Sequence, residues 1–210
     1  MIPERIMTML TPGRIREKFP LQRGDVELAP VELKDAEPLF EAAVRSRKEL
    51  IRWYNWLPQF SLEQARDNLE RSVLNWEDTA IRDWTSLSFV IRHNGSVAGC
   101  VDLFDIQIKS LECEIGGWVD ATRAGQGIGR SALHLMAQFW QTELNFRRLF
   151  VTIPIDNPVS SAVARHVGSC FTGITLPATV HDLEKGQAEM RLMEITPETL
   201  VAEQDLFGSH

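Results

Sequence analysis

The chain has 210 residues, of which 44% are hydrophobic and 24% are charged, and its formal net charge at pH 7 is −7. This length and apolar content suffice for one buried core, so a single soluble domain is the simplest expectation. The acidic balance argues against a nucleic-acid-binding surface and is compatible with a cationic partner such as an amine.

Residues 1–23 are expected to form an N-terminal extension, either irregular or packed on a neighbour, because they contain prolines at positions 3, 12 and 20. Charged residues interrupt every apolar run in this segment, and no later segment approaches the roughly 18 uninterrupted apolar residues of a membrane span. We therefore expect a cytoplasmic protein with no membrane partner. Residues 24–197 are expected to form the domain, and residues 198–210 a C-terminal tail.

The first half of the domain is predicted to begin with a strand and two helices. The strand lies near Val26–Val31, and Asp35 can cap a helix that ends at about Ile51. Ser61 and Gln64 have the spacing of a capping box, which predicts the start of a second helix. Apolar residues recur along one side of this second helix: Leu62, Ala65, Leu69, Val73 and Trp76.

An aromatic segment and a hairpin accompany these helices. The sequence WYNWLP, which contains Trp53, Tyr54 and Trp56, lies between the two helices. These rings could line the cleft of an acceptor substrate or simply fill the core, and the sequence leaves both alternatives open. Two strands, Ser86–Arg92 and Ser96–Ile106, are predicted to form a hairpin because an Asn-Gly turn joins them.

The centre of the chain is a glycine-rich turn between a strand and a helix. The sequence CEIGGWV, Cys113–Val119, predicts the strand, and apolar residues at helical spacing predict a helix over Arg130–Asn145. Between them the turn reads Ala124, Gly125, Gln126, Gly127, Ile128 and Gly129. Its glycines allow a tight turn whose amides converge at a positive helix end, a place that suits a phosphate.

The glycine spacing excludes two common nucleotide motifs. The sixth position of a dinucleotide fingerprint is Arg130 or Ala132 instead of glycine, and no Gly-Lys-Ser/Thr run follows as a P-loop requires. Two alternatives remain open. The loop either binds a pyrophosphate through its main chain or merely starts a helix.

The last part of the domain is predicted to add a parallel strand. Arg148–Ile155 is apolar and β-branched, and Asn157 then caps a short helix that has Pro158 at its first position and ends near Gly168. A loop follows Phe171, and a final strand covers 188–195. Strands that alternate with helices in this way predict an α/β fold with a mixed sheet and a parallel pair.

Several stretches together resemble the GNAT superfamily of acetyl-CoA-dependent N-acetyltransferases, and within it the RimJ/RimL type. They are CEIGGWV, AGQGIG at a helix start, the run from Asn157 to Phe171, and RKELIRWYNWLP upstream. The resemblance covers roughly residues 24–195. It implies a single GNAT-like domain of mostly antiparallel strands, with a splayed central parallel pair flanked by helices. It also implies acetyl-CoA as cosubstrate, transfer to the α-amino group of a ribosomal-protein N-terminus, and a homodimer.

The resemblance also implies roles for individual residues. The pantetheine arm of the coenzyme would enter between the two parallel strands, bonded by the main chain of Trp118 and Val119 and by Asn157. Ser160 would protonate the leaving sulfur, although it could equally serve only as a helix-start residue. The sequence departs from the family pattern at Ala124, where Arg or Gln is common, and Arg123 precedes that position by one residue. The family's frequent tyrosine acid corresponds to Ala164 in this chain.

The chemistry of transfer from a thioester to an amine needs few groups. The amine attacks the carbonyl directly, so no nucleophilic side chain is required. An α-amino group has a pKa near 7.7–8.0, so part of it is already neutral at physiological pH and little help from a general base is needed to deprotonate it. Glu114 is the candidate base, acting through water, unless it is only a solvated strand residue. Gly116 and Gly117 in mid-strand predict a bulge or a close backbone approach, which would free amides for the oxyanion.

Two other functions remain open on the sequence alone. The acceptor could be a small amine, such as a polyamine or an antibiotic, or the protein could bind acyl-CoA without catalysing transfer. A metal site is not expected, because no histidine pair has ligand spacing. The three cysteines also have strand-like apolar contexts, which favours buried thiols: Cys100, Cys113 and Cys170.

Overall fold

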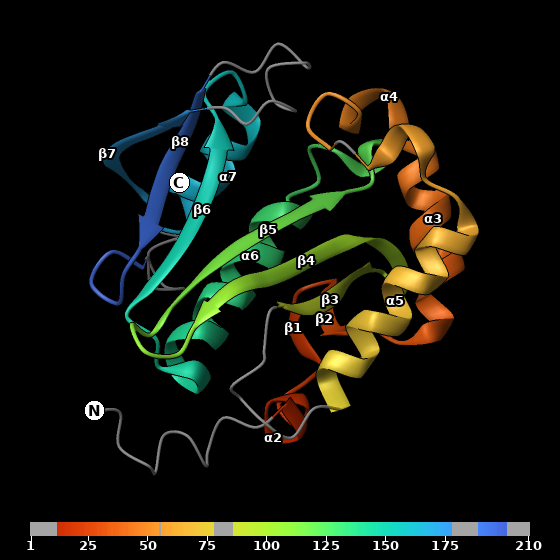
Figure 1. Ribbon diagram of the computed structural model, residues 1–210, viewed down its shortest axis with the longest axis horizontal. Helices are drawn as coiled ribbons and strands as arrows, with labels where there is room; N and C mark the ends of the chain where they lie inside the picture. The colour runs from red at the N-terminus through yellow and green to blue at the C-terminus, as the bar shows by residue number, and fades with distance from the viewer. Residues whose placement is uncertain (1–11, 55, 78–85, 178–188, 201–210) are drawn as a thin grey trace.

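The computed structural model describes residues 12–54, 56–77, 86–177 and 189–200, and these form one mixed α/β domain (Figure 1). Its single eight-stranded sheet is flanked by helices, so the predicted fold class is confirmed. The strands are β1 (Leu21–Arg23), β2 (Val26–Pro30), β3 (Ser86–His93), β4 (Ser96–Gln107), β5 (Glu112–Val119), β6 (Arg148–Pro154), β7 (Cys170–Pro177) and β8 (Glu189–Ile195).

The sheet order is β1-β2-β3-β4-β5-β6-β8-β7. Every neighbouring pair is antiparallel except β5 and β6, which are parallel as predicted. A parallel pair needs a crossover connection, and the glycine turn and the long helix supply it. The turn therefore lies at the carboxyl end of β5, next to the place where the sheet changes from antiparallel to parallel.

The central parallel pair separates after three residues. β5 and β6 pair only at Glu112 with Arg148, Cys113 with Leu149, and Glu114 with Phe150. Beyond this point the two strands diverge, and the gap between them is visible in Figure 1. The predicted splay is thus present, and main-chain groups on this edge of β5 beyond Glu114 have no partner in β6.

The predicted bulge at the paired glycines is wrong, because both glycines stay in register with β4. Gly116 pairs with Asp102 and Gly117 with Val101, and the irregularity of this pair lies further along, between Phe104 and Gln107 of β4. The alternative prediction, a close backbone approach, is correct. A Cβ at Gly117 would lie 2.5 Å from the carbonyl oxygen of Cys100.

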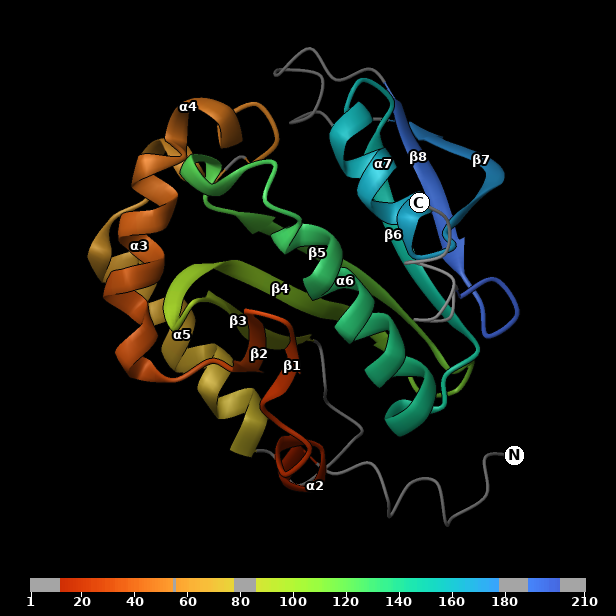
Figure 2. The same ribbon diagram turned by 180° about the vertical axis from the view of Figure 1, so that it is seen from behind.

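The helices cover both faces of the sheet. They are α2 (Pro12–Arg16), α3 (Ala36–Arg45), α4 (Arg47–Leu50), α5 (Leu62–Glu77), α6 (Ile128–Phe139) and α7 (Pro158–His166). Helix α6 lies across one face, whereas α3 and α5 lie on the other side (Figures 1 and 2). In the described part of the chain, no helix combines the length and hydropathy needed to cross a membrane.

The main core lies between the sheet and α6. Strand residues with odd numbers in β3, such as Leu87, Phe89 and Ile91, face α6 and are buried, together with Met136 and Phe139 of the helix. The opposite face of β3 carries Ser86, Ser88, Val90 and Arg92, of which only Val90 is buried. This asymmetry leaves room for a cavity on the α5 side of the sheet.

Two segments near the ends of the domain are more regular than expected. Residues 12–23, predicted to be either irregular or packed on a neighbour, contain α2 and β1, and the ring of Phe19 packs against Trp76, Phe89 and Phe139 of the same chain. Residues 170–177, predicted mainly as a loop, form β7. β7 is an edge strand that pairs only with β8 and has no buried face, so the alternating pattern that marks a strand is missing.

The predicted helix over residues 35–51 is divided at Ser46 into α3 and α4. Its expected cap was also wrong in detail. The Asp35 side chain makes no cap bond to α3 and instead accepts hydrogen bonds from Arg92 Nη2 (2.5 Å) and the Glu32 amide (3.0 Å). The capping box of Ser61 and Gln64 and the cap of Asn157 are confirmed. Residues 1–11 of the predicted extension and residues 201–210 of the tail lie outside the described residues.

Candidate active site

The glycine turn presents a row of main-chain amides to solvent. Gly125 (φ +80°) and Gly127 (φ +78°) take left-handed conformations, and Gly127 is the N-cap of α6. Residues 124–127 are exposed. In the described part of the chain, no group accepts a hydrogen bond from the amides of Gly125 to Ile128. Donors that converge at a helix N-terminus form a site for an anion.

A buried carboxylate holds this turn against helix α3. Asp120 follows β5 directly and is 1% exposed. Its Oδ2 accepts hydrogen bonds from Arg45 Nε (3.1 Å) and Nη2 (2.9 Å), and its Oδ1 from Thr122 N (3.0 Å) and Oγ1 (2.8 Å). Ser46 Oγ accepts a hydrogen bond from the Ala121 amide at 2.8 Å. Burial raises the pKa of Asp120, but the bonds from Thr122 and Arg45 outweigh it, so the net pKa is lowered and the group is ionised.

Arg123 does not point its guanidinium at the glycine turn. Its Nη1 donates a hydrogen bond to the carbonyl oxygen of His93 at 3.2 Å, in the turn between β3 and β4. The cradle formed by residues 124–129 therefore consists of main chain, with Ala124 contributing no long side chain. This matches the interpretation of a pyrophosphate site built from amides.

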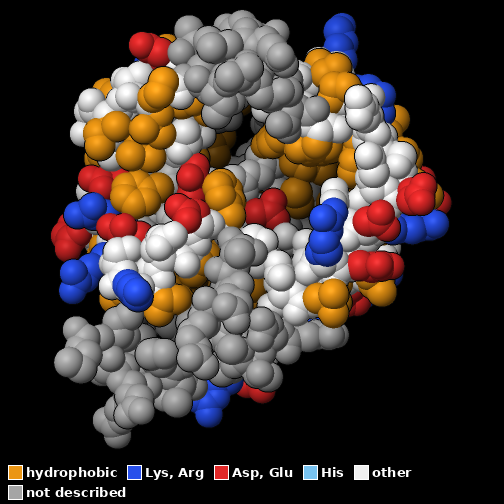
Figure 3. All heavy atoms as spheres, in the orientation of Figure 1, with side chains coloured by type: hydrophobic (Ala, Val, Ile, Leu, Met, Phe, Trp, Pro, Cys, Tyr) orange, Lys and Arg blue, Asp and Glu red, His pale blue; other side chains and the backbone are white. Residues whose placement is uncertain are grey.

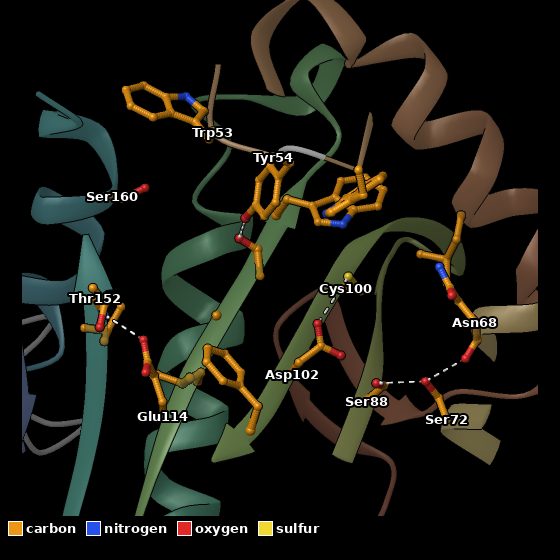
Figure 4. A pocket seen from close by; sticks show the side chains of 18 of the residues that line it. Trp53, Tyr54, Asn68, Ser72, Ser88, Cys100, Asp102, Glu114, Thr152 and Ser160 are labelled. Atoms are coloured by element: carbon orange, nitrogen blue, oxygen red, sulfur yellow. Dashed lines mark hydrogen bonds between the residues drawn. The ribbon is translucent and has the colours of Figure 1, made fainter. Parts of the chain in front are cut away.

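Glu114 lies where β5 and β6 part. It is half-buried, and its Oε1 accepts a hydrogen bond from the Thr152 amide of β6 at 3.2 Å (Figure 4). The carboxylate thus substitutes for the strand pairing that ends at this residue. The same side chain lines the main pocket, so it can face an acceptor.

Asn157 and Ser160 lie on the other side of the splay, at the start of α7. Asn157 is 8% exposed, and its Oδ1 accepts a hydrogen bond from the Ser160 amide at 3.1 Å. The Ser160 side chain is half-buried and lines the same pocket. Both residues line the pocket, and Ser160 lies across it from Glu114 of β5 (Figure 4). The cap bond uses the Asn157 oxygen and leaves its amide nitrogen able to donate.

The pocket has a volume of about 550 Å³ and lies between the splayed strands, helix α5 and the aromatic segment. In the space-filling view hydrophobic side chains lie along the right side of a hollow, and acidic side chains lie below it (Figure 3). Trp53, Tyr54 and Trp56 line the pocket, so these rings form a pocket wall, and their contact with an acceptor substrate stays a prediction. Leu57, which is fully buried, anchors the segment beneath them.

Tyr54 makes a direct contact with β5 that the sequence did not reveal. Its hydroxyl donates a hydrogen bond to the Gly117 carbonyl oxygen at 2.6 Å. Burial raises the pKa of Tyr54, so the phenol stays protonated. The two residues are 63 positions apart in the chain, and no local pattern links them.

Asp102 is a second acidic residue of the pocket that sequence reasoning missed. It lies on β4 in the cross-strand row formed with Ser88 of β3 and Gly116 of β5. Burial raises the pKa of Asp102 to about 6, although contacts with Ser88 and Cys100 act in the opposite direction. The alternation of β4 could have indicated that Asp102 shares a face with Cys100 and Phe104, but not that this face borders a cavity.

The structure groups the predicted site residues into two neighbouring regions. Glu114, Trp118, Asn157 and Ser160 line the pocket. Val119 does not line it, and neither does the glycine turn, residues 124–129, which follows β5 outside the pocket. In the described part of the chain, no cluster of three or more histidine, cysteine or acidic side chains could hold a metal ion. The arrangement thus offers an anion cradle, a gap between strands and a pocket beyond it.

A cradle for phosphate beside a splayed strand pair and a pocket is the architecture of an acyl-CoA-dependent transferase. Residues 25–169 match the family model described as an acetyltransferase (GNAT) domain, and the chain therefore belongs to this family of acetyltransferases. The resemblance to RimJ/RimL enzymes is also confirmed by the relatives below.

A curated relative is the ribosomal-protein-serine acetyltransferase of Escherichia coli (strain K12), which is 27% identical over 150 residues, covering 70% of this chain and 80% of the relative. Among solved structures, Mycobacterium smegmatis RimJ in complex with CoA-disulfide has a TM-score of 0.72 at 23% identity, covering 84% of both chains. RimL, the ribosomal L7/L12 α-N-protein acetyltransferase, in complex with coenzyme A has a TM-score of 0.73 at 20% identity, covering 83% of this chain and 95% of that one. At such identities the two structures support the shared fold.

Proposed function

We propose that this acetyltransferase transfers the acetyl group of acetyl-CoA to the α-amino group of a peptide or protein N-terminus. The observation that carries the proposal is the splay. β5 and β6 stop pairing beyond Glu114, between an exposed amide cradle and the pocket. A coenzyme whose diphosphate binds the cradle would direct its thioester through this gap towards the pocket. The curated relative whose name is ribosomal-protein-serine acetyltransferase supports a protein acceptor.

Binding of acetyl-CoA would use main chain at both ends of the extended ligand. The amides of residues 124–129 would hold the diphosphate, and the uncovered edge of β5 at Trp118 and Val119 would bond the pantetheine arm. The Asn157 side chain, whose amide nitrogen remains able to donate, would bond the arm from the opposite strand. Preorganised amides near the thioester carbonyl would also stabilise the oxyanion that forms on attack.

The transfer would proceed by direct attack of the neutral amine on the thioester. Glu114 would accept the amine proton through water, since it lines the pocket at the mouth of the splay. Ser160 would return a proton to the departing thiolate. Tyr54, which burial keeps protonated, is a second donor in the same pocket.

A small amine acceptor is the second candidate, and the pocket's negative charge favours it as much as it favours a peptide amine. A thiol-release assay with acetyl-CoA separates the two functions. We expect release with short peptides that have a free amino terminus and much slower release with polyamines. Thiol release with small amines alone would show that the acceptor is a small amine and not a peptide. If acetyl-CoA raises the thermal stability but no acceptor causes thiol release, the protein binds acyl-CoA without catalysing transfer. A cytoplasmic location and a homodimer remain predictions, which fractionation and sedimentation can check.

A further inference from the structure

The pocket carries negative charge without a positive partner. Its acidic lining residues are Asp102 and Glu114, and among the described residues that line it there is no lysine, arginine or histidine. The other titratable groups facing it are Tyr54 of the aromatic segment and Cys100 of β4, and burial raises the pKa of both, so both stay neutral. The cavity is therefore anionic at neutral pH.

Asp102, which is half-buried, differs from the buried carboxylates Asp35 and Asp120. Asp35 is paired with Arg92 at 2.5 Å and Asp120 with Arg45 at 2.9 Å. Within the described part of the chain, Asp102 has no cationic partner. Its contacts are the Cys100 thiol, with Sγ 3.9 Å from Oδ2, and the Ser88 hydroxyl. An acidic group that is desolvated and left without a counter-ion costs stability, so a ligand that supplies the positive charge gains affinity.

The surroundings of Asp102 suit a compact cation. Its cross-strand partner Ser88 begins a polar row, in which Ser88 Oγ donates to Ser72 Oγ at 3.2 Å and Ser72 Oγ to the Asn68 carbonyl oxygen at 3.0 Å (Figure 4). Aromatic rings of the segment from Trp53 to Phe60 form the opposite wall of the pocket. A carboxylate facing aromatic rings is a favourable environment for an ammonium group.

Register places Asp102 next to the expected position of the thioester. Asp102 lies directly opposite Gly116 in the antiparallel pair, and cross-strand partners have Cβ positions about 4.5–5.5 Å apart. Gly116 has no side chain, and the Gly117 carbonyl next to it is reached by Tyr54 from the pocket side. By contrast, Glu114 bridges to the Thr152 amide where the splay begins. Asp102 is thus the pocket carboxylate that is not engaged with β6.

We propose that Asp102 is the subsite that binds the acceptor's amine in its protonated form before transfer. The proposal deepens the proposed function and rests on it for the identity of the acceptor as an amine. Most primary amines enter as ammonium ions at neutral pH, and this subsite would replace the water that such an ion loses. Asp102 then acts as a specificity residue for primary amines against neutral groups of equal size.

The test compares Asp102→Asn with the wild-type enzyme, using a short peptide amide with a free amino terminus as acceptor. Asparagine keeps the shape and removes the charge. We expect the KM for the peptide to rise about ten- to a hundredfold, as expected for a lost charged hydrogen bond, with kcat changed far less and the Kd for acetyl-CoA unchanged. The wild-type KM should also rise below about pH 6, and the KM of Asp102→Asn should not. Asp67→Asn, on the exposed side of α5, is the matched control for net charge.

An unchanged KM in Asp102→Asn, or an equal rise in Asp67→Asn, would overturn the proposal. If wild-type enzyme acetylates no peptide, the proposed function has failed, and ligand-observed NMR still tests the subsite with butylamine and its neutral analogue butanol. Butylamine should bind the wild type and not Asp102→Asn, and butanol should bind neither. Equal binding of butylamine to both proteins, or no binding to the wild type, would refute an ammonium subsite.

Discussion

Replacing Gly127 by alanine should separate the phosphate cradle from the fold. Gly127 has φ +78°, a left-handed conformation, and an added Cβ would meet no atom within 4 Å. The substitution therefore creates strain without a clash. The strain of one L-residue in this conformation is about 1–2 kcal/mol, and for a domain of this size the melting temperature should fall by roughly 2–8 °C.

The same substitution should cost more in coenzyme binding than in stability. The new methyl group would occupy open space beside the amides of Gly125 to Ile128, where the diphosphate is expected. Loss of one charge-assisted hydrogen bond, about 1.5–3 kcal/mol, weakens binding roughly ten- to a hundredfold. Calorimetric titration with acetyl-CoA, at a temperature where the variant is fully folded, measures this directly.

Gly95→Ala is the matched control. Gly95 has φ +74° in the turn between β3 and β4, and a Cβ there also meets no atom within 4 Å. It should lose the same stability as Gly127→Ala while keeping the wild-type affinity for acetyl-CoA. If the two variants bind acetyl-CoA equally well, the cradle does not hold the diphosphate and the reasoning is refuted.

Four further substitutions test other parts of the site. Glu114→Gln should lower kcat by about a hundredfold or more and flatten the pH dependence of kcat below neutrality, since a carboxylate base is inactive when protonated; an unaltered kcat profile would show that Glu114 is not the base. Ser160→Ala should slow single-turnover release of coenzyme A if its hydroxyl protonates the thiolate, and a wild-type rate would leave Tyr54 as the donor. Asp120→Asn should destabilise the fold by about 2 kcal/mol, through loss of charged hydrogen bonds, and weaken acetyl-CoA binding; normal affinity would show that the turn needs no anchor. The folded-state pKa of Asp102 is raised to about 6, so the folded protein holds this proton more tightly than the unfolded chain does, and stability falls as pH rises from about 4 to about 6. Over this range the free energy of unfolding of the wild type should fall by about 3 kcal/mol relative to that of Asp102→Asn. Parallel curves of unfolding free energy against pH would contradict this.

Much of the fold follows from local pattern. The strand–turn–helix order around Gly127, the cap at Asn157 and the Asn-Gly hairpin each depend on residues that are neighbours in sequence, so their physical signals are complete within a short window. The parallel pair follows from that order, because a helix between two strands carries the chain back so that the second strand can run in the same direction as the first. The position of the glycine turn, between β5 and α6, could be predicted for the same reason.

The contacts that complete the site depend on distant residues. Tyr54 reaches Gly117 across 63 positions, and Arg45 reaches Asp120 across 75. No periodicity links such pairs, and only the folded sheet brings them together. Asp102 has the sequence environment of an ordinary strand residue, and its importance arises from a cavity that α5 and the aromatic segment create over it. The edge strand β7 could not be predicted because it buries no face.

The most direct test of the account is a crystal structure with acetyl-CoA bound. The diphosphate should accept hydrogen bonds from the amides of residues 125–128, and the pantetheine arm should pass between β5 and β6 beyond Glu114, with the thioester facing the pocket that contains Asp102. A diphosphate bound elsewhere, or a pair of strands closed against the coenzyme, would contradict the account.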